Sequence, residues 1–291
     1  MINYICKKII KFSLEEIKMK KIIALIMAVL MMTVCFAGCG QETVSSTTSS
    51  TDNKTTSSEA TEEKIEFKGT TVKEGKLVMA TNAYFQPYEY YEGDKIVGID
   101  AEIAAEIAKK LGLELEIQDM AFDSIITAVS EGSADLGLAG MTVDEKRLTS
   151  VDFSISYAKG IQVVIVKEDS KIKTVDDVTG KKVGVQLGTT GDMYATDDYG
   201  KDKVTQFTTG NEAVAALLGG DVDCVIIDNE PAKAFVANNK GLKILDTTYA
   251  DEDYAACIRK GNKELLDAVD QAIDQLIADG TIDKIVDKYI K

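Results

Sequence analysis

From residue 69 onward, apolar and polar residues follow two patterns that alternate along the chain. Short apolar runs predict strands, and segments with apolar residues at every third or fourth position predict helices. Strand, helix, strand, helix and strand with short connections is the pattern of a parallel sheet. In the first series the predicted strands are 76–81, 113–120 and 134–140, and the predicted helices are 100–112 and 122–132.

The helix predicted at 100–112 has an isoleucine or leucine at every fourth position from Ile99 to Leu111. Asp100 is the expected N-cap of this helix, and Gly112 is its expected end. The next helix is expected to end at Gly132 for the same reason.

A second series of strands and helices covers residues 181–246, and two amphipathic helices in 265–289 complete the pattern. The predicted strands of this series are 181–188, 204–207, 222–228 and 242–246, and its helices are 190–200, 211–220 and 229–241.

Two apolar runs, 160–166 and 254–260, lie where the chain passes from one series to the other and back. They predict an α/β fold with two α/β lobes joined by a two-strand hinge. Facing sheets bind ligands at the carboxyl ends of their strands, so a closing cleft is expected between the lobes. The expected boundaries are 69–157 and 253–291 for lobe 1, 161–248 for lobe 2, and 158–160 and 249–252 for the hinge.

The segment before the folded part has the features of an export signal. Residues 19–38 combine lysines, an apolar run and small residues, as a secretory signal peptide does. The letters FAGC resemble a bacterial lipoprotein box, which makes Cys39 the expected site of lipidation; an uncleaved N-terminal anchor is the alternative. Residues 1–18 are interpreted as an upstream extension, and 39–68 as the lipidated cysteine and a flexible Ser/Thr-rich linker.

Composition removes several function classes. The chain has no histidine, which excludes a His-based catalytic triad and a His-ligated metal. Residues 1–39 hold six lysines and two glutamates, so the remainder carries a net charge of −19 against −15 for the whole chain. Such a surface repels nucleic acid and anionic lipid. Cys224 and Cys257 lie in apolar runs and are expected to be buried. We expect neither a metal nor a cofactor.

The carboxyl ends of the first-lobe strands present groups suited to a small ligand, namely Asn82, Phe85, Phe122, Gly140, Thr142 and Arg147. A glycine lets a ligand approach the backbone, and the planar fork of an arginine fits a carboxylate. Each group also has a plain structural interpretation. The two phenylalanines suit a core, and Arg147 suits a surface salt bridge with Asp144 or Asp152.

The second lobe adds complementary groups. Gly188, Thr189 and Thr190 lie between a strand and the start of a helix, where backbone N–H groups attract anions. Asp228 ends another strand and can pair with a cation, although Asp228 or Asn229 can equally be a helix N-cap. An arginine and helix-start amides for a carboxylate, an aspartate for an ammonium and phenylalanines for a side chain together fit a free α-amino acid.

Residues 76–289 resemble the bacterial extracellular solute-binding proteins of family 3, the amino-acid receptors of ABC importers. The resemblance is carried by ATNAYFQPYEY, GIDAEIAAEIAKKLG, AFDSIITAVSEGSADLGLAGMTVDEKR, VDFSISY and VDCVIIDNEP. It implies a two-lobed periplasmic-binding-protein-like type II fold and a monomeric, non-catalytic receptor. Such a receptor is lipid-anchored outside the cell membrane, or periplasmic, and delivers a free amino acid to permease subunits.

The resemblance also implies roles for the site residues. Arg147, Thr142 and the amides near Thr189 and Thr190 hold the ligand carboxylate, and Asp228 holds its ammonium with the Gly140 carbonyl and the Thr142 hydroxyl. Phe85 and Phe122 enclose the ligand side chain, and Asn82 and Gln186 face its tip.

The position of Asn82 is usually acidic in the glutamine and basic amino-acid receptors that resemble this chain. Here Asn82 is neutral, as is Gln186, which favours a polar uncharged ligand, with glutamine first and a basic amino acid or cystine as alternatives. Tyr84 or Glu89 can alter this preference.

Two other function classes remain open. The cyclohexadienyl dehydratases resemble these receptors, and Glu230 is the candidate acid for such chemistry. A sensor module is the other class; with no kinase or cyclase after Lys291, it would act through a separate partner.

Overall fold

The computed structural model describes residues 64–290. The predicted upstream extension, the signal peptide, the lipidation site Cys39 and most of the linker lie outside the described residues. Within residues 64–290 no helix is long and apolar enough to span a membrane.

A mixed sheet of nine strands runs through the described part of the chain, in the order β5-β1-β6-β12-β7-β10-β8-β9, with β11 paired to β7. Its strands are β1 (Lys76–Thr81), β5 (Glu114–Asp119), β6 (Leu136–Gly137), β7 (Val151–Lys167), β8 (Val183–Gln186), β9 (Val204–Phe207), β10 (Cys224–Asp228), β11 (Leu242–Ile244) and β12 (Ala250–Arg259). The predicted parallel pairs occur in both series, since β1 pairs with β5 and β6, and β8 pairs with β9 and β10.

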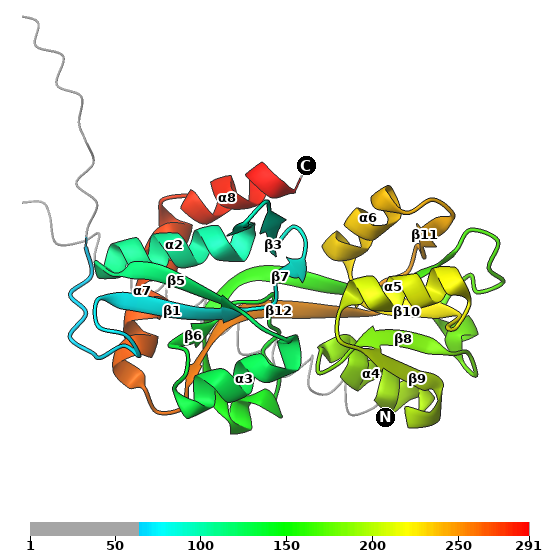
Figure 1. Ribbon diagram of the computed structural model, residues 1–291, viewed down its shortest axis with the longest axis horizontal. Helices are drawn as coiled ribbons and strands as arrows, with labels where there is room; N and C mark the ends of the chain where they lie inside the picture. Colours follow the sequence, from blue (N-terminus) through cyan, green and yellow to red (C-terminus); the bar gives the residue numbers. More distant parts are fainter. Residues whose placement is uncertain (1–63, 291) are drawn as a thin grey trace, which may run out of the picture. The chain divides into compact units, whose positions relative to one another are not determined.

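Within residues 64–290, seven α-helices pack beside this sheet in two groups (Figure 1). The first group, α2 (Ile99–Leu111), α3 (Phe122–Glu131), α7 (Lys263–Ala278) and α8 (Thr281–Tyr289), lies around β5, β1 and β6. The second group, α4 (Thr190–Tyr199), α5 (Gly210–Gly219) and α6 (Asn229–Asn238), lies around β8, β9 and β10. We call these two groups lobe 1 and lobe 2.

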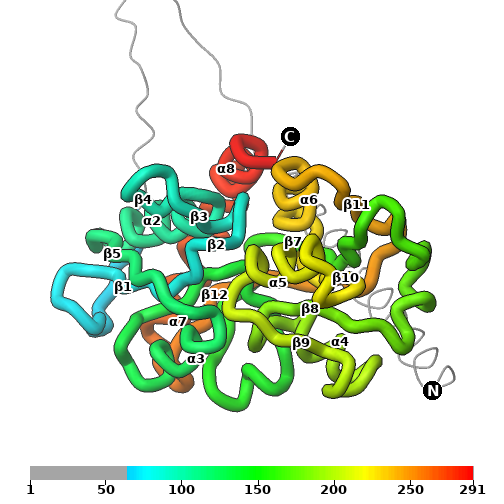
Figure 2. The backbone as a smooth tube through the Cα atoms, turned by 45° about the vertical axis from the view of Figure 1, so that its right-hand side comes forward, coloured from blue at the N-terminus to red at the C-terminus, as the bar shows by residue number. Residues whose placement is uncertain are grey.

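Two long antiparallel strands, β7 and β12, connect the lobes. They pair with each other from Val151 with Arg259 to Gln162 with Ala250. From Gln162 onward β7 pairs with β10 and β11 of lobe 2. At the other end of the ladder, Cys257 and Ile258 of β12 also pair with β6 of lobe 1. The chain therefore passes between the lobes twice (Figure 2), and the predicted hinge residues 158–160 and 249–252 lie on or beside these strands.

Helix ends follow the sequence in most places. Gly112 and Gly132 both adopt left-handed backbone conformations at the C-caps of α2 and α3, where residues with a Cβ are disfavoured. The prediction of Asp100 as an N-cap was wrong, because α2 begins at Ile99 and Gly98 is its N-cap. The Asp100 carboxylate is buried instead, and its Oδ2 accepts hydrogen bonds from the Gly140 N–H and the Tyr157 hydroxyl.

A second, three-stranded sheet follows β1 and was not predicted. It consists of β2 (Tyr84–Phe85), β3 (Glu89–Glu92) and β4 (Lys95–Val97), which are paired antiparallel. In β3 the first residue, Glu89, is fully buried, whereas Tyr91 and Glu92 are exposed. The sheet therefore turns one acidic side chain into the interior of the protein.

The core of each lobe consists of the aliphatic residues that the pattern places on strands and inner helix faces. Ile103 and Ile107 of α2 are fully buried, as are Val183 and Val185 of β8. Cys224 and Cys257 are buried and unpaired, so the prediction that they act as small core residues is confirmed.

Candidate ligand-binding site

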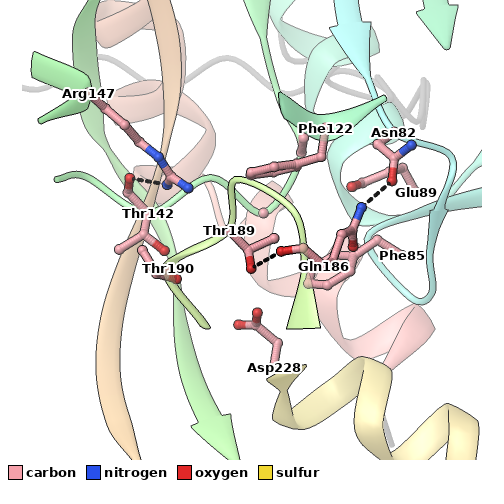
Figure 3. Close-up of a pocket in the computed structure, with 12 residues that line it drawn as sticks. Asn82, Phe85, Glu89, Phe122, Thr142, Arg147, Gln186, Thr189, Thr190 and Asp228 are labelled. Atoms are coloured by element: carbon pink, nitrogen blue, oxygen red, sulfur yellow. Dashed lines mark hydrogen bonds between the residues drawn. The ribbon is translucent and has the colours of Figure 1, made fainter. Parts of the chain in front are cut away.

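One pocket between the lobes is lined by all ten predicted site residues (Figure 3). Its lining consists of Asn82, Phe85, Phe122, Gly140, Thr142, Arg147, Gln186, Thr189, Thr190 and Asp228, together with Glu89 and Ala139. The residues come from strand ends that lie up to 146 positions apart in the chain, between Asn82 and Asp228.

Arg147 is a buried cation at the start of a short 3-10 helix, Arg147–Thr149. Its Nη1 donates to the Thr142 carbonyl at 2.8 Å, and its Nη2 donates to the Gly188 carbonyl of lobe 2 at 3.0 Å. The guanidinium carbon lies 5.4 Å from the centre of the Phe122 ring. Burial lowers the pKa of this guanidinium, which shows that its charge is poorly solvated.

The predicted alternative, a salt bridge to Asp144 or Asp152, is not formed. Asp144 Oδ1 accepts from the backbone N–H groups of Lys146 and Arg147, and Asp152 Oδ2 accepts from the Gly261 N–H. Within residues 64–290 no carboxylate lies within ion-pair distance of the Arg147 guanidinium. A buried arginine without a counterion is unfavourable unless another anion approaches it.

The loop before α4 faces Arg147 from lobe 2. Thr189 is the N-cap: its hydroxyl donates to the Gln186 carbonyl at 2.8 Å and accepts from the Asp192 N–H at 3.2 Å. Thr190 is the first helical residue, so its N–H is among those that a helix leaves without an intrahelical partner. The helix dipole adds partial positive charge at this point, which favours an anion.

Asp228 is a buried carboxylate at the junction of β10 and α6. It occupies the N-cap position, but its side chain makes no capping hydrogen bond. Its Oδ2 accepts from Gln162 Nε2 at 2.7 Å, and its Oδ1 has no hydrogen-bond partner among the described residues. Burial and then the charge of Glu252 raise the pKa of Asp228 well above its ordinary value. The site therefore favours a cation beside this carboxylate.

Gly140, which follows β6 of lobe 1, lies close to the Phe85 ring. Its φ is +52°, and an added Cβ would lie 2.8 Å from Phe85 Cε1. A side chain at this position is therefore excluded by both backbone conformation and space. The small residue lets the Phe85 ring and the backbone of residues 140–142 line the same pocket.

The far end of the pocket is built from amides. Gln186 Nε2 of lobe 2 donates to Asn82 Oδ1 of lobe 1 at 2.9 Å and to the Thr208 carbonyl at 3.2 Å. Asn82 Nδ2 in turn donates to the Met120 carbonyl at 2.8 Å. These contacts connect the lobes at the end opposite Arg147 (Figure 3).

Glu89 lies beside these amides and lines the pocket; it was predicted only as a residue that can alter the ligand preference. It is 0% exposed, and neither of its carboxyl oxygens has a geometrically defined partner among the described residues. Burial and the nearby Asp100 charge raise its pKa well above the ordinary value. No periodic signal marks Glu89 in the sequence, because β3 runs from the buried Glu89 to the exposed Tyr91 and Glu92 without alternation.

No group of three or more Cys, Asp or Glu side chains in residues 64–290 is arranged to hold a metal ion. The charged groups of the pocket are instead one arginine and two carboxylates, set apart by phenylalanine rings. This arrangement suits a small organic ligand that carries both signs of charge.

Residues 77–291 match the model of the bacterial extracellular solute-binding proteins of family 3. The chain is 35% identical over 219 residues to the arginine-binding extracellular protein ArtP of Bacillus subtilis (strain 168), covering 74% of this chain and 86% of that protein. Other curated relatives are named "Probable histidine-binding protein" (Neisseria gonorrhoeae), L-cystine-binding protein TcyJ (Escherichia coli strain K12) and ABC transporter glutamine-binding protein GlnH (Bacillus subtilis strain 168).

Solved structures show the same fold. An ancestral arginine-binding protein bound to arginine is 41% identical with a TM-score of 0.70, covering 75% of this chain and 99% of that one. A structure of an ancestral arginine-binding protein bound to glutamine is 40% identical with a TM-score of 0.71 and the same coverage. AncCDT-1, a precursor of cyclohexadienyl dehydratase, is 32% identical with a TM-score of 0.70, covering 75% and 96%. The predicted two-lobed fold is confirmed.

Proposed function

The chain belongs to the bacterial extracellular solute-binding proteins of family 3, and we propose that it is the amino-acid receptor of an ABC importer. One observation carries the proposal: a buried arginine and a buried aspartate, neither with an ion-pair partner among the described residues, line one pocket between two lobes. A free α-amino acid supplies both missing counterions.

The proposed contacts follow from this polarity. The ligand carboxylate pairs with Arg147 and the helix-start amide of Thr190, and the ammonium pairs with Asp228. The Thr142 hydroxyl and the Gly140 carbonyl complete the ammonium site. Hydrogen bonds to charged groups contribute about 1.5–3 kcal/mol each, and micromolar affinity requires about 8 kcal/mol in total. Two charge pairs and an enclosed side chain reach that value.

Glu89 favours arginine as the ligand. Its buried carboxyl interacts with the Asp100 carboxyl and lies beside Asn82 and Gln186, at the end of the pocket away from Arg147. A guanidinium offers planar N–H donors for a carboxylate and for the two amide oxygens. This revises the preference for an uncharged ligand, which rested on the neutral side chains of Asn82 and Gln186. The arginine-binding relatives support the revision.

Glutamine is the second candidate, and the Asn82–Gln186 amide pair favours it. An amide side chain can donate to and accept from two neutral amides. The raised pKa of Glu89 also favours its neutral form, which can donate to an amide oxygen.

We propose that the protein binds without catalysis. Glu230, the candidate acid for dehydratase-like chemistry, accepts from Lys233 Nζ at 2.7 Å and does not line the pocket. The similarity to AncCDT-1 therefore supports a shared fold. It does not support dehydratase activity, because the candidate acid Glu230 lies outside the pocket.

We further propose that the protein acts as a monomer outside the cytoplasm, anchored by a lipid on Cys39 and docking on permease subunits when it is loaded. The signal-like residues 19–38 and the extracellular family support export and anchoring.

A thermal-unfolding screen of the purified chain against the twenty amino acids, cystine and ornithine tests the proposal. A ligand at a hundred times its Kd contributes about 2.7 kcal/mol, which raises the Tm of a domain this size by about 5–10 °C. We expect the largest shift with arginine and the next with glutamine. If no amino acid raises the Tm, the receptor function is contradicted. If only lysine or histidine raises it, the assigned ligands are contradicted.

A further inference from the structure

The Gln162 amide joins two buried carboxylates where the lobes meet. Gln162 lies on β7, and its Nε2 donates to Asp228 Oδ2 at 2.7 Å and to Glu252 Oε2 at 2.9 Å. Both hydrogens of the amide are therefore taken by carboxylates. On β10 the residue paired with Gln162 is Asp228. On β12 the residue paired with Gln162 is Ala250, and Glu252 lies two residues further along this strand.

Each member of this triad has one oxygen without a partner. Asp228 Oδ1, Glu252 Oε1 and Gln162 Oε1 are all buried and make no hydrogen bond within the described residues. Glu252 is 5% exposed and does not line the pocket, whereas Asp228 does. Two buried negative charges on one neutral amide are unfavourable unless a cation or a proton balances them.

The groups that face the pair leave this charge incompletely balanced. The titratable groups that interact with Asp228 or Glu252 from the surrounding elements are Tyr88, Glu89, Arg147 and Tyr194. Arg147 is the one cation among them, and its guanidinium hydrogen-bonds to two backbone carbonyls. A proton on Asp228 or a ligand ammonium must supply the remaining balance.

We propose that Glu252 is a positioning residue of the ammonium site, which orients Asp228 through the Gln162 amide and sets the pH range in which the site accepts its ligand. The inference rests on the proposed function, because it assigns the ligand ammonium to Asp228.

The proposal implies that ligand binding is coupled to the loss of a proton from Asp228. Because burial and the Glu252 charge raise the pKa of Asp228, the free protein holds a proton on this carboxyl to a higher pH than usual. A bound ammonium requires the ionised carboxylate. Binding therefore breaks the Asp228 O–H bond, releases the proton to solvent and forms the ammonium–carboxylate pair. Affinity rises with pH until Asp228 is ionised in the free protein.

The test is calorimetric titration of the full chain and its Glu252→Gln variant between pH 5 and pH 8. The titrant is L-arginine or L-glutamine, whichever the ligand screen selects, in buffers of different ionisation enthalpy. Glutamine at 252 keeps an oxygen that can accept from Gln162, so the substitution removes charge and keeps shape. We expect less proton release, and a rise in affinity shifted to lower pH by about one unit.

Asp251→Asn is the matched control, since Asp251 is an exposed neighbour on the same strand. It removes the same charge and should leave the wild-type pH profile unchanged. Gln162→Met keeps the Glu252 charge and removes both hydrogen bonds, so we expect it to weaken binding by at least about tenfold.

Two results overturn the inference alone: wild-type proton release and pH profile in Glu252→Gln, or wild-type affinity in Gln162→Met. If Glu252→Gln does not fold, the Gln162→Met measurement decides. A wild-type chain that binds no amino acid overturns the proposed function, and with it this inference.

Discussion

At the scale of single residues, the site is a set of buried charges that the protein itself does not neutralise. Arg147 and Asp228 are both at least nine-tenths buried, and neither forms an ion pair within residues 64–290. Their types and positions at strand ends were visible in the sequence. Their burial without counterions was not, because it depends on which side chains of the opposite lobe approach them.

We propose that the choice of ligand depends on Glu89. We expect Glu89→Gln to weaken arginine binding by about tenfold to a hundredfold, since a hydrogen bond to a charged group contributes about 1.5–3 kcal/mol. Glutamine binding should change much less, because it requires no negative charge there. Calorimetric titration with both amino acids measures the difference.

Glu92→Gln provides the control for this prediction. Glu92 lies on the same strand and is exposed, so its variant should bind both ligands like the wild type. Wild-type arginine affinity in Glu89→Gln would show that the ligand side chain does not reach this end of the pocket.

At the scale of elements, the strands and helices with clear periodicity were predictable. The predicted strands 76–81 and 204–207 coincide with β1 and β9, and Gly112 and Gly132 end their helices as expected. The predicted strand 134–140 is paired only at Leu136–Gly137, because the following residues leave the sheet to line the pocket. The sheet of β2, β3 and β4 was missed because its aromatic-rich strands are too short to show a period.

Between the paired strands β7 and β12, one glycine packs directly against a tyrosine ring, and this contact is expected to affect how the two lobes close. Gly160 lies on β7 within the proposed hinge, and an added Cβ would lie 2.2 Å from Tyr254 Cζ on β12. We expect Gly160→Ala to lower the free energy of unfolding by about 1–3 kcal/mol, because overpacking forces the strands apart. The variant should also bind the ligand more weakly, since the separated strands disfavour the closed arrangement of the lobes.

Gly219→Ala is the matched control for this substitution. Gly219 ends α5, where an added Cβ meets only Asp221 Oδ2 at an ordinary contact distance of 3.6 Å. The free energy of unfolding of the Gly219→Ala variant should be unchanged or slightly higher than that of the wild type. Chemical denaturation measures both variants, and a Gly160→Ala protein as stable as the wild type would contradict the packing account of these strands.

At the scale of the whole molecule, the proposed function requires both lobes to contact one ligand. The lobes already meet through Arg147 with the Gly188 carbonyl and through Gln186 with Asn82, one contact at each end of the pocket. A ligand bound between these contacts would touch both lobes at once. Because each lobe supplies one of the two charges, neither lobe alone offers a complete site.

The central claim is that Arg147 and Asp228 hold the two charged groups of an α-amino acid. Calorimetric titration of the purified chain with L-arginine, L-glutamine and the corresponding decarboxylated amines, agmatine and 4-aminobutanamide, tests it most directly. The account predicts a 1:1 complex with at least one of the amino acids, and binding of its amine weaker by about a hundredfold or more, because Arg147 is then buried without a counterion. Equal affinity for an amino acid and its amine, or no binding of either amino acid, would contradict it.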